Sequence, residues 1–333
     1  MICTDEDRIR TQGRRALGTW AVLIAAGAVA AGVGWASDDA AGQMPDSRIR
    51  YFGQTPPGIT PEIFAQGVVS TEAIELNGVF TPDSREFFFT RLVDGIDTMF
   101  HSRLAGDMWS TPRALMVYPG QKRAVAVDMA VSRDGRELYF LGEHPHEYTR
   151  DPSNWDLWVS QLVNGAWATA RVLPPPISSP AREWYPVVVG DGSLYFSSDR
   201  PGGHGLGDVY RAQRRAGSGF AEPVNIGAPI NTESSEGDTF VAPDESYMIV
   251  AASRPGGSGQ SDLHVSFRGG DGRWQALVNL GAAINTDQTE FCPMVTPDGK
   301  YLFFSRRWGA TWEETTAGDV YWVDAKVLDR FRR

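Results

Sequence analysis

The feature that most constrains the fold of this chain is an internal repeat of about fifty residues. A short turn of the type T-P-D-G recurs five times, and its aspartate is found at Asp83, Asp134, Asp191, Asp244 and Asp298. An apolar strand follows each turn, at residues 87–90, 138–141, 194–198, 247–253 and 301–305. Self-similarity at this period is typical of propellers and solenoids, in which each repeat is one supersecondary unit.

Each repeat contains signals for four short strands. A polar or Gly-rich loop follows the apolar strand, and an aspartate then opens a third strand. An aromatic residue opens the expected fourth strand in four copies, at Trp109, Trp167, Phe220 and Trp274. Four short strands per repeat, separated by Gly, Pro and Asp turns, predict a four-stranded antiparallel blade.

The fifth copy lacks a fourth strand, and the missing piece is found near the other end of the chain. The segment IFAQGVVSTEAIE (63–75) matches VNIGAPINTESSE (224–236) and VNLGAAINTDQTE (278–290) in length and pattern. An N-terminal strand that completes the last blade closes a propeller and removes exposed sheet edges. We therefore predict an all-β, five-bladed β-propeller over residues 63–333, with its ring closed by an N-terminal strand.

The repeat resembles a known family in residues 191–210 and 242–265, which read DGSLYFSSDRPGGHGLGDVY and APDESYMIVAASRPGGSGQSDLHV. These segments are similar to the TolB-type β-propeller repeat, a relative of the WD repeat. The resemblance implies a propeller, with a six-bladed TolB-like ring as the alternative to five blades. It leaves function open, because such propellers serve as binding scaffolds, receptor parts and accessory domains of peptidases.

Residues 1–36 have the pattern of an export signal. Arg8, Arg10, Arg14 and Arg15 precede the uncharged segment 16–36, and small residues surround a possible cleavage site after Ala36. The segment is also long enough to span a bilayer as an uncleaved anchor, and the Arg14–Arg15 pair leaves twin-arginine export open beside the general route. Either case predicts an exported, periplasmic or membrane-tethered body, with residues 37–62 as a short linker and lead-in.

Charge and cysteine content limit the possible partners. The formal net charge is -10, and the sequence shows no basic patch that would offset phosphate repulsion, so nucleic acid is not an expected ligand. The two cysteines are Cys3, in the leader, and Cys292, so a processed body has no disulfide. We expect a monomer that contacts the membrane only through its N-terminal segment.

Three polar positions recur at the face where the first strand of each blade begins. A glutamate stands eight residues before the turn aspartate in four copies, at Glu75, Glu183, Glu236 and Glu290, and Ala126 replaces it in the second copy. An arginine follows the second strand at Arg91, Arg200, Arg254 and Arg306, and an aspartate opens the third strand at Asp97, Asp156, Asp208, Asp262 and Asp319. Regular recurrence favours structural ties between the arginines and the acids. The alternative is a ring of glutamates that binds a ligand or a Ca²⁺ ion at the channel mouth.

Two loops hold further candidates on the same face. The loop 142–156 contains His144 and His146, a pair that suits Zn²⁺, together with Trp155. The loop 306–318 contains Trp308 and Trp312, whose rings suit sugar or peptide recognition. We predict no cofactor, with Ca²⁺ at the glutamates and Zn²⁺ at the histidine pair as the alternatives.

No catalytic constellation is recognisable, since the chain has no G-x-S-x-G elbow and Cys292 lies in a predicted strand. The sequence therefore favours an exported binding module that recognises a protein or carbohydrate at the channel mouth. A carbohydrate-active hydrolase is the alternative, with the recurring glutamates as its carboxylates.

Overall fold

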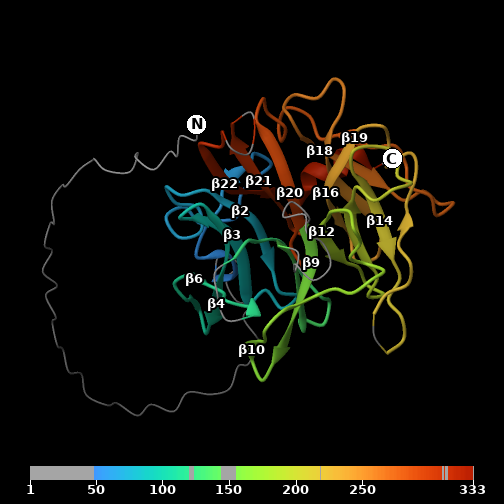
Figure 1. Cartoon of the computed structure of the whole chain (residues 1–333). Helices are drawn as coiled ribbons and strands as arrows, with labels where there is room; N and C mark the ends of the chain where they lie inside the picture. The colour runs from blue at the N-terminus through green and yellow to red at the C-terminus, as the bar shows by residue number, and fades with distance from the viewer. Residues whose placement is uncertain are drawn as a thin grey trace, which may run out of the picture. The chain divides into compact units, whose positions relative to one another are not determined.

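The computed structural model describes residues 49–119, 124–143, 155–217, 219–309, 311 and 314–332. Within these residues the strands form five antiparallel sheets that follow one another along the chain. Figure 1 shows the sheets as blades around a common centre, with the colour running once around the ring. The five-bladed prediction is confirmed, and the six-bladed alternative is wrong for these residues. Over the same residues, no helix has the length and apolar character needed to cross a membrane.

Each blade is a meander whose first strand lies nearest the centre, since the first strands of neighbouring blades contact one another. The first strands are β2 (Glu75–Phe80), β7 (Ala126–Val131), β12 (Glu183–Val188), β16 (Ser235–Val241) and β20 (Thr289–Val295). The second strands are β3 (Glu86–Val93), β8 (Glu137–Glu143), β13 (Leu194–Ser198), β17 (Tyr247–Ser253) and β21 (Tyr301–Trp308). The third strands are β4 (Ile96–Ala105), β9 (Trp155–Val163), β14 (Asp208–Ala212), β18 (Asp262–Phe267) and β22 (Ala317–Asp324).

The fourth strands are short and begin after the predicted aromatic residue. They are β6 (Arg113–Ala114), β11 (Arg171–Val172), β15 (Val224–Asn225), β19 (Val278–Asn279) and, in the last blade, β1 (Glu62–Ile63). In the first two blades the aromatic residue lies in a separate two-residue strand, β5 (Met108–Trp109) or β10 (Ala166–Trp167). Each of these strands pairs with the C-terminal end of the third strand. The fourth strand then pairs with the middle of the same third strand.

The ring closes as the sequence predicts. Strand β1 pairs antiparallel with β22, with Glu62 opposite Trp322 and Ile63 opposite Tyr321. The closing segment also contributes to the core, because Phe64 is fully buried and packs 4.8 Å from the ring of Phe303. Tyr51, in the lead-in, is buried against Trp322 as well. Residues from both ends of the described chain therefore share one aromatic core between the last blade and the first.

The recurring turn aspartates have a local structural role. Asp83, Asp134 and Asp298 each accept a hydrogen bond from a Thr or Ser hydroxyl two residues earlier in the same turn. Side chains that bond their own turn in this way stabilise the reversal between two strands. The most visible part of the repeat is thus explained by hairpin chemistry.

All five first strands carry a β-bulge near the recurring glutamate or Ala126, and the bulge of the fourth blade begins one residue earlier than the others. The register shifts between Leu76 and Val79, Val127 and Ala130, Trp184 and Val187, Glu236 and Thr239, and Phe291 and Met294. A bulge inserts an extra residue and redirects a side chain. The five bulges place one additional side chain from each blade at the centre of the propeller, where the first strands meet.

Candidate functional site

The four recurring glutamates are buried inside their own blades. Each is fully buried and forms an ion pair with the predicted arginine of the same blade. Arg200 and Arg254 follow the second strand as predicted, whereas Arg91 and Arg306 lie within it, because β3 and β21 extend further. The distances are 2.6 Å for Arg91 Nε to Glu75 Oε1, 3.1 Å for Arg200 Nη2 to Glu183 Oε1, 2.9 Å for Arg254 Nη2 to Glu236 Oε1 and 2.6 Å for Arg306 Nε to Glu290 Oε1. The ties predicted between arginines and acids are therefore present for this set.

A hydroxyl residue four positions before each glutamate completes the tie. Its side chain and its backbone N–H both donate to the carboxylate, at Thr71, Ser179, Thr232 and Thr286. Each glutamate thus accepts at least three hydrogen bonds from its own blade. Ligand or Ca²⁺ binding by these glutamates stays a prediction, and their oxygens are already engaged by groups of the fold.

The second blade replaces the tie with an aromatic side chain. Ala126 lies opposite Gly142 in the register. At the same position, the first and last blades have a glutamate opposite its arginine partner. Tyr118 is buried and donates its hydroxyl proton to the Val125 carbonyl oxygen. A Cβ added to Gly142 would lie only 1.8 Å from the Tyr118 hydroxyl. The position of the tyrosine therefore requires glycine at position 142.

The aspartates that open the third strands do not form one set. Asp208 and Asp262 are buried and accept backbone N–H bonds from the Gly-rich loops before them, which they hold in place. Asp156 is fully buried, and Asp319 has its pKa raised by burial and by the nearby Glu75. Asp97 differs, since it lines a cavity at the centre. No described arginine of the predicted set forms an ion pair with any of these five residues.

The predicted tryptophan candidates that the structure describes lie in different parts of it. Trp155 lines the central cavity. Trp308 instead packs at a centroid distance of 6.5 Å from Tyr321, on the core of the last two blades. His144, His146 and Trp312 lie outside the described residues.

A ring of unlike side chains occupies the bulges at the centre. The residue two positions after the recurring glutamate, or after Ala126, is Asn77, Asp128, Tyr185, Asp238 or Cys292. Four of the five have a positive φ, at Asn77 (52°), Asp128 (54°), Tyr185 (48°) and Cys292 (50°), a conformation that non-glycine residues adopt only where the surroundings impose it. The glutamates repeat from blade to blade, whereas these neighbours differ.

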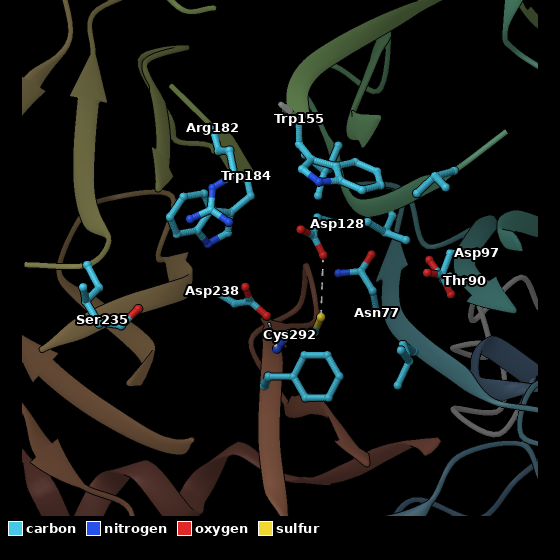
Figure 2. Close-up of a pocket in the computed structure, with 16 residues that line it drawn as sticks. Asn77, Thr90, Asp97, Asp128, Trp155, Arg182, Trp184, Ser235, Asp238 and Cys292 are labelled. Carbon is cyan, nitrogen blue, oxygen red and sulfur yellow. Dashed lines mark hydrogen bonds between the residues drawn. The ribbon is translucent and has the colours of Figure 1, made fainter. Parts of the chain in front are cut away.

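Asp128, Asp238 and Cys292 form one cluster, shown in Figure 2. One carboxylate oxygen of each aspartate and the Cys292 sulfur all lie within 4.8 Å of one another. The backbone N–H of Cys292 donates to Asp238 Oδ2 at 3.0 Å, and the thiol lies 3.9 Å from Asp128 Oδ1. A backbone hydrogen bond from Tyr185 reaches Asp128. Strands from three different blades therefore bring the cluster together.

Burial raises the pKa of each titratable side chain in the cluster. Burial and the neighbouring Asp238 hold the pKa of Asp128 well above its ordinary value, and burial raises the pKa of Asp238 to about 6. Burial and the two aspartates raise the pKa of the Cys292 thiol, so it is protonated at neutral pH. Burial also raises the pKa of Asp97 to about 6. These shifts follow from desolvation of charge without a cationic partner.

The cluster is the floor of a cavity of about 530 Å³ that opens on the face where the first strands begin. Trp155 and Trp184 flank the upper part of this cavity in Figure 2. Apolar side chains complete the wall, namely Leu76, Val125, Val127, Leu141, Leu206 and Phe291. We call this space the channel-mouth cavity. Its volume lies in the range of small-molecule sites.

Tyr185 separates this cavity from the opposite side of the propeller. It is buried, lines a second cavity of about 480 Å³, and donates its hydroxyl proton to the Pro293 carbonyl oxygen at 2.8 Å. The bond runs from the third blade to the last. Asn77 lines both cavities, and its Oδ1 accepts the Met129 backbone N–H at 2.7 Å.

The ring residues are absent from the predicted site, because the prediction rests on positions that recur from blade to blade. Asp128 and Asp238 do not belong to any recurring set, and Cys292 is expected only as a residue of a predicted strand. The residues directly before and after each ring position also change from blade to blade, so the position does not stand out in the sequence. The signal that remains is its fixed spacing, two residues after the recurring glutamate or Ala126.

Comparison with known proteins does not assign this chain to a family. No protein-family model matches the chain, and no curated protein matches its sequence. Similar solved structures include a protein described as TolB from Agrobacterium tumefaciens, at 15% identity and a TM-score of 0.47, covering 72% of each chain. The catalytic domain of a GH62 α-L-arabinofuranosidase from Coprinopsis cinerea has 10% identity and a TM-score of 0.49, covering 80% of this chain and 97% of the other.

A puromycin-hydrolysing peptidase from Mycobacterium tuberculosis has 14% identity and a TM-score of 0.41, over 77% of this chain and 47% of the peptidase. The neighbours thus include a TolB propeller, a glycosidase and a peptidase. At these identities and scores they carry no argument about activity, and the propeller assignment rests on the sheet topology of the chain itself.

Proposed function

We propose that the propeller is a binding module that takes part of a ligand, a sugar unit or a side chain of a protein partner, into the channel-mouth cavity. One observation carries the proposal. The residues that form the floor differ between blades, while the ties beside them repeat. Asn77 in the first blade accepts a neighbouring backbone N–H with a neutral amide, so the fold does not require charged groups at these positions.

The cavity walls support recognition of a partly apolar ligand. Trp155 and Trp184 are half-buried, and Leu206 is largely exposed at the rim. Tryptophan combines a large apolar surface with one hydrogen-bond donor, which suits sugar rings and amino-acid side chains. Ligand pockets commonly combine such walls with a few converging polar groups.

The test is a binding screen with the full chain, in which neutral monosaccharides, amino-acid amides and simple amines are titrated by calorimetry. We expect at least one class to bind, and Trp184→Ala to weaken that binding by about tenfold or more. Trp274→Ala is the matched control, since Trp274 is also half-buried but contacts Arg268 away from the channel. Equal weakening by both variants, or no binding by any class, would contradict the proposal.

A second candidate function is glycoside hydrolysis with the floor carboxylates. The observation that favours it is the separation of Asp128 and Asp238, which place one oxygen each within 4.8 Å of the other. Retaining glycosidases hold their two carboxyl groups about 5 Å apart, and a pair with oxygens within this bound is near enough for that arrangement. The recurring glutamates are poorer candidates, because each is buried in an arginine pair. Release of nitrophenol from aryl glycosides by the full chain, lost in both Asp128→Asn and Asp238→Asn, would establish it.

The same proposal places the binding module outside the cytoplasm. It is supported by the four arginines that precede the uncharged segment 16–36. Fractionation of cells that express the full chain, followed by N-terminal sequencing, tests it. A periplasmic protein that begins at Ser37 is expected for a cleaved signal, and an intact chain in the membrane fraction for an anchor. Recovery of the intact chain in the cytoplasm would contradict it.

A further inference from the structure

The channel-mouth cavity is lined by three acidic side chains that have no cationic partner among the described residues. Asp97, Asp128 and Asp238 all line it. Among the described residues, no Lys, Arg or His forms an ion pair with any of the three, and Asp97 Oδ1 is buried without a hydrogen-bond partner. Arg182 is the one described cationic residue in the lining, and its guanidinium is held by Asp199 at 2.7 Å.

This arrangement is costly for the empty protein. A half-buried carboxylate without a cation loses part of its hydration, and this desolvation raises the pKa of all three side chains. Each recurring glutamate has an arginine partner in the same fold, so the propeller has the means to pair a buried acid. Three unpaired aspartates around one cavity therefore indicate that the positive charge comes from outside.

The walls indicate what kind of cation fits. A bare metal ion needs a few cubic ångströms, whereas the cavity has about 530 Å³ and is lined mainly by apolar and aromatic side chains. The faces of tryptophan attract ammonium and guanidinium groups through the ring quadrupole. Trp155 and Trp184 lie above the acid cluster in Figure 2, so an apolar stem between them would direct a charged end toward Asp128 and Asp238.

We propose that the channel-mouth cavity binds an alkylammonium group, a primary amine on an apolar stem, with Asp97, Asp128 and Asp238 as its counter-charges. The inference rests on the proposed function and narrows the ligand class. A lysine side chain of a partner and a free polyamine both present this chemistry.

The expected pH dependence of amine binding follows from the titratable groups around the acid cluster. Asp128 on β7 faces Asp238 on β16, Cys292 on β20, Tyr185 on β12 and Asp97 on β4, and none of these is a cation. Below pH 6 the carboxyl groups of Asp97 and Asp238 are largely protonated, because burial raises the pKa of each to about 6. A primary amine remains protonated throughout this range, near the value for lysine. Binding should therefore tighten between pH 5 and pH 7.5 and release a proton from Asp128.

The first experiment is calorimetry of the full chain with n-pentylamine and with n-pentanol, its neutral isostere, at both pH values. We expect pentylamine to bind about tenfold more tightly than pentanol at pH 7.5, with an enthalpy that depends on the ionisation enthalpy of the buffer. Cadaverine and Nα-acetyl-lysine amide then distinguish a free polyamine from a protein side chain as the source. A simple apolar site would not show the pH dependence.

Substitutions test the counter-charges. Asp238→Asn and, separately, Asp97→Asn should each weaken amine binding by about tenfold and leave pentanol binding unchanged. Asp287→Asn is the control for long-range charge, since this exposed acid lies just before β20 and does not line the cavity. Asp97 lies on another blade, so the second variant keeps the test informative if one substitution disturbs the fold.

The remaining outcomes separate the inference from the proposed function. Binding of a neutral sugar or of pentanol, with no preference for the amine, overturns the cation and leaves the binding module standing. Tight binding of Zn²⁺ or Ca²⁺ that is lost in Asp238→Asn also overturns it, in favour of an inorganic ion. No binding by any probe overturns both.

Discussion

Two carboxylates on one strand of this propeller have opposite surroundings. Glu236 and Asp238 are two residues apart on β16. Glu236 is fully buried and bonded to Arg254 and Thr232, whereas Asp238 touches the channel-mouth cavity and has no cationic partner among the described residues. The first belongs to a set that recurs in four blades, and the second is one of five unlike residues at its position.

The comparison distinguishes a carboxylate that stabilises the fold, Glu236, from one that lines the cavity, Asp238. A buried carboxylate that is paired and hydrogen-bonded contributes to a specific packing arrangement, and removing one partner leaves a charge unpaired. An unpaired carboxylate in a cavity costs stability and is retained only where it has another use. Substitution at the two positions should therefore have effects of opposite sign.

The largest effect is expected for Glu236→Gln. The neutral amide leaves the Arg254 guanidinium without its carboxylate, and we expect the free energy of unfolding to fall by about 3 kcal/mol. Chemical denaturation of the full chain at pH 7 measures the loss. Glu233→Gln, which removes an exposed acid three residues earlier, should change little. A loss below that of the control would show that the recurring ties are not structural.

The second blade offers a test of the same comparison, because it has lost the tie. Gly142→Ala places a methyl group against the Tyr118 hydroxyl and should cost about 2 kcal/mol through overpacking. Adding Tyr118→Phe removes the hydroxyl and should recover part of the loss, as a double-mutant cycle would report. Gly58→Ala is the control, since a Cβ there meets no atom within 4 Å. Independent, additive effects would contradict the assignment of Tyr118 as the substitute for the tie.

Asp238→Asn should stabilise the protein at alkaline pH. The folded-state pKa of Asp238 is raised to about 6 by burial, above the ordinary value of 3.8. The native state therefore binds the proton more tightly than the unfolded chain, and stability falls as the pH rises from about 4 through 6. The variant avoids this loss. A shift of about two pKa units is worth at most roughly 3 kcal/mol, and Asp238 is only half-buried, so solvent screening reduces the expected gain to about 1 kcal/mol at pH 8.

The same variant should show no gain at pH 4, where Asp238 is already protonated in the folded protein. Melting temperatures of wild type and variant across this range provide the measurement. The Cys292 N–H retains an acceptor in the variant, because the asparagine Oδ1 can replace Asp238 Oδ2. Destabilisation at pH 8 would mean that Asp238 acts as a structural tie like Glu236.

The sequence predicts the fold of this chain far better than its site. Turn aspartates such as Asp83, the blade-closing segment that contains Ile63 and the Glu–Arg pairs recur, and recurrence reveals them without coordinates. The cluster at the centre depends on bulges that turn Asp128 and Cys292 toward one point from strands 164 residues apart. Neither the bulge nor the meeting of three blades leaves a periodic signal, so periodicity identified the scaffold and missed the cavity.

The smallest expected effect concerns the reactivity of Cys292. The thiol is buried, and burial together with Asp238 and Asp128 raises its pKa, so it should resist alkylation at pH 8 in the folded protein. Thiolate is the reactive form, and access is limited as well. Peptide mapping after brief iodoacetamide treatment should find Cys292 unlabelled until denaturant is added. In Asp238→Asn one negative neighbour is gone, so the labelling rate should rise by less than about tenfold. An unchanged rate would show that access alone protects the thiol, and that Asp238 does not influence the charge of the cavity floor.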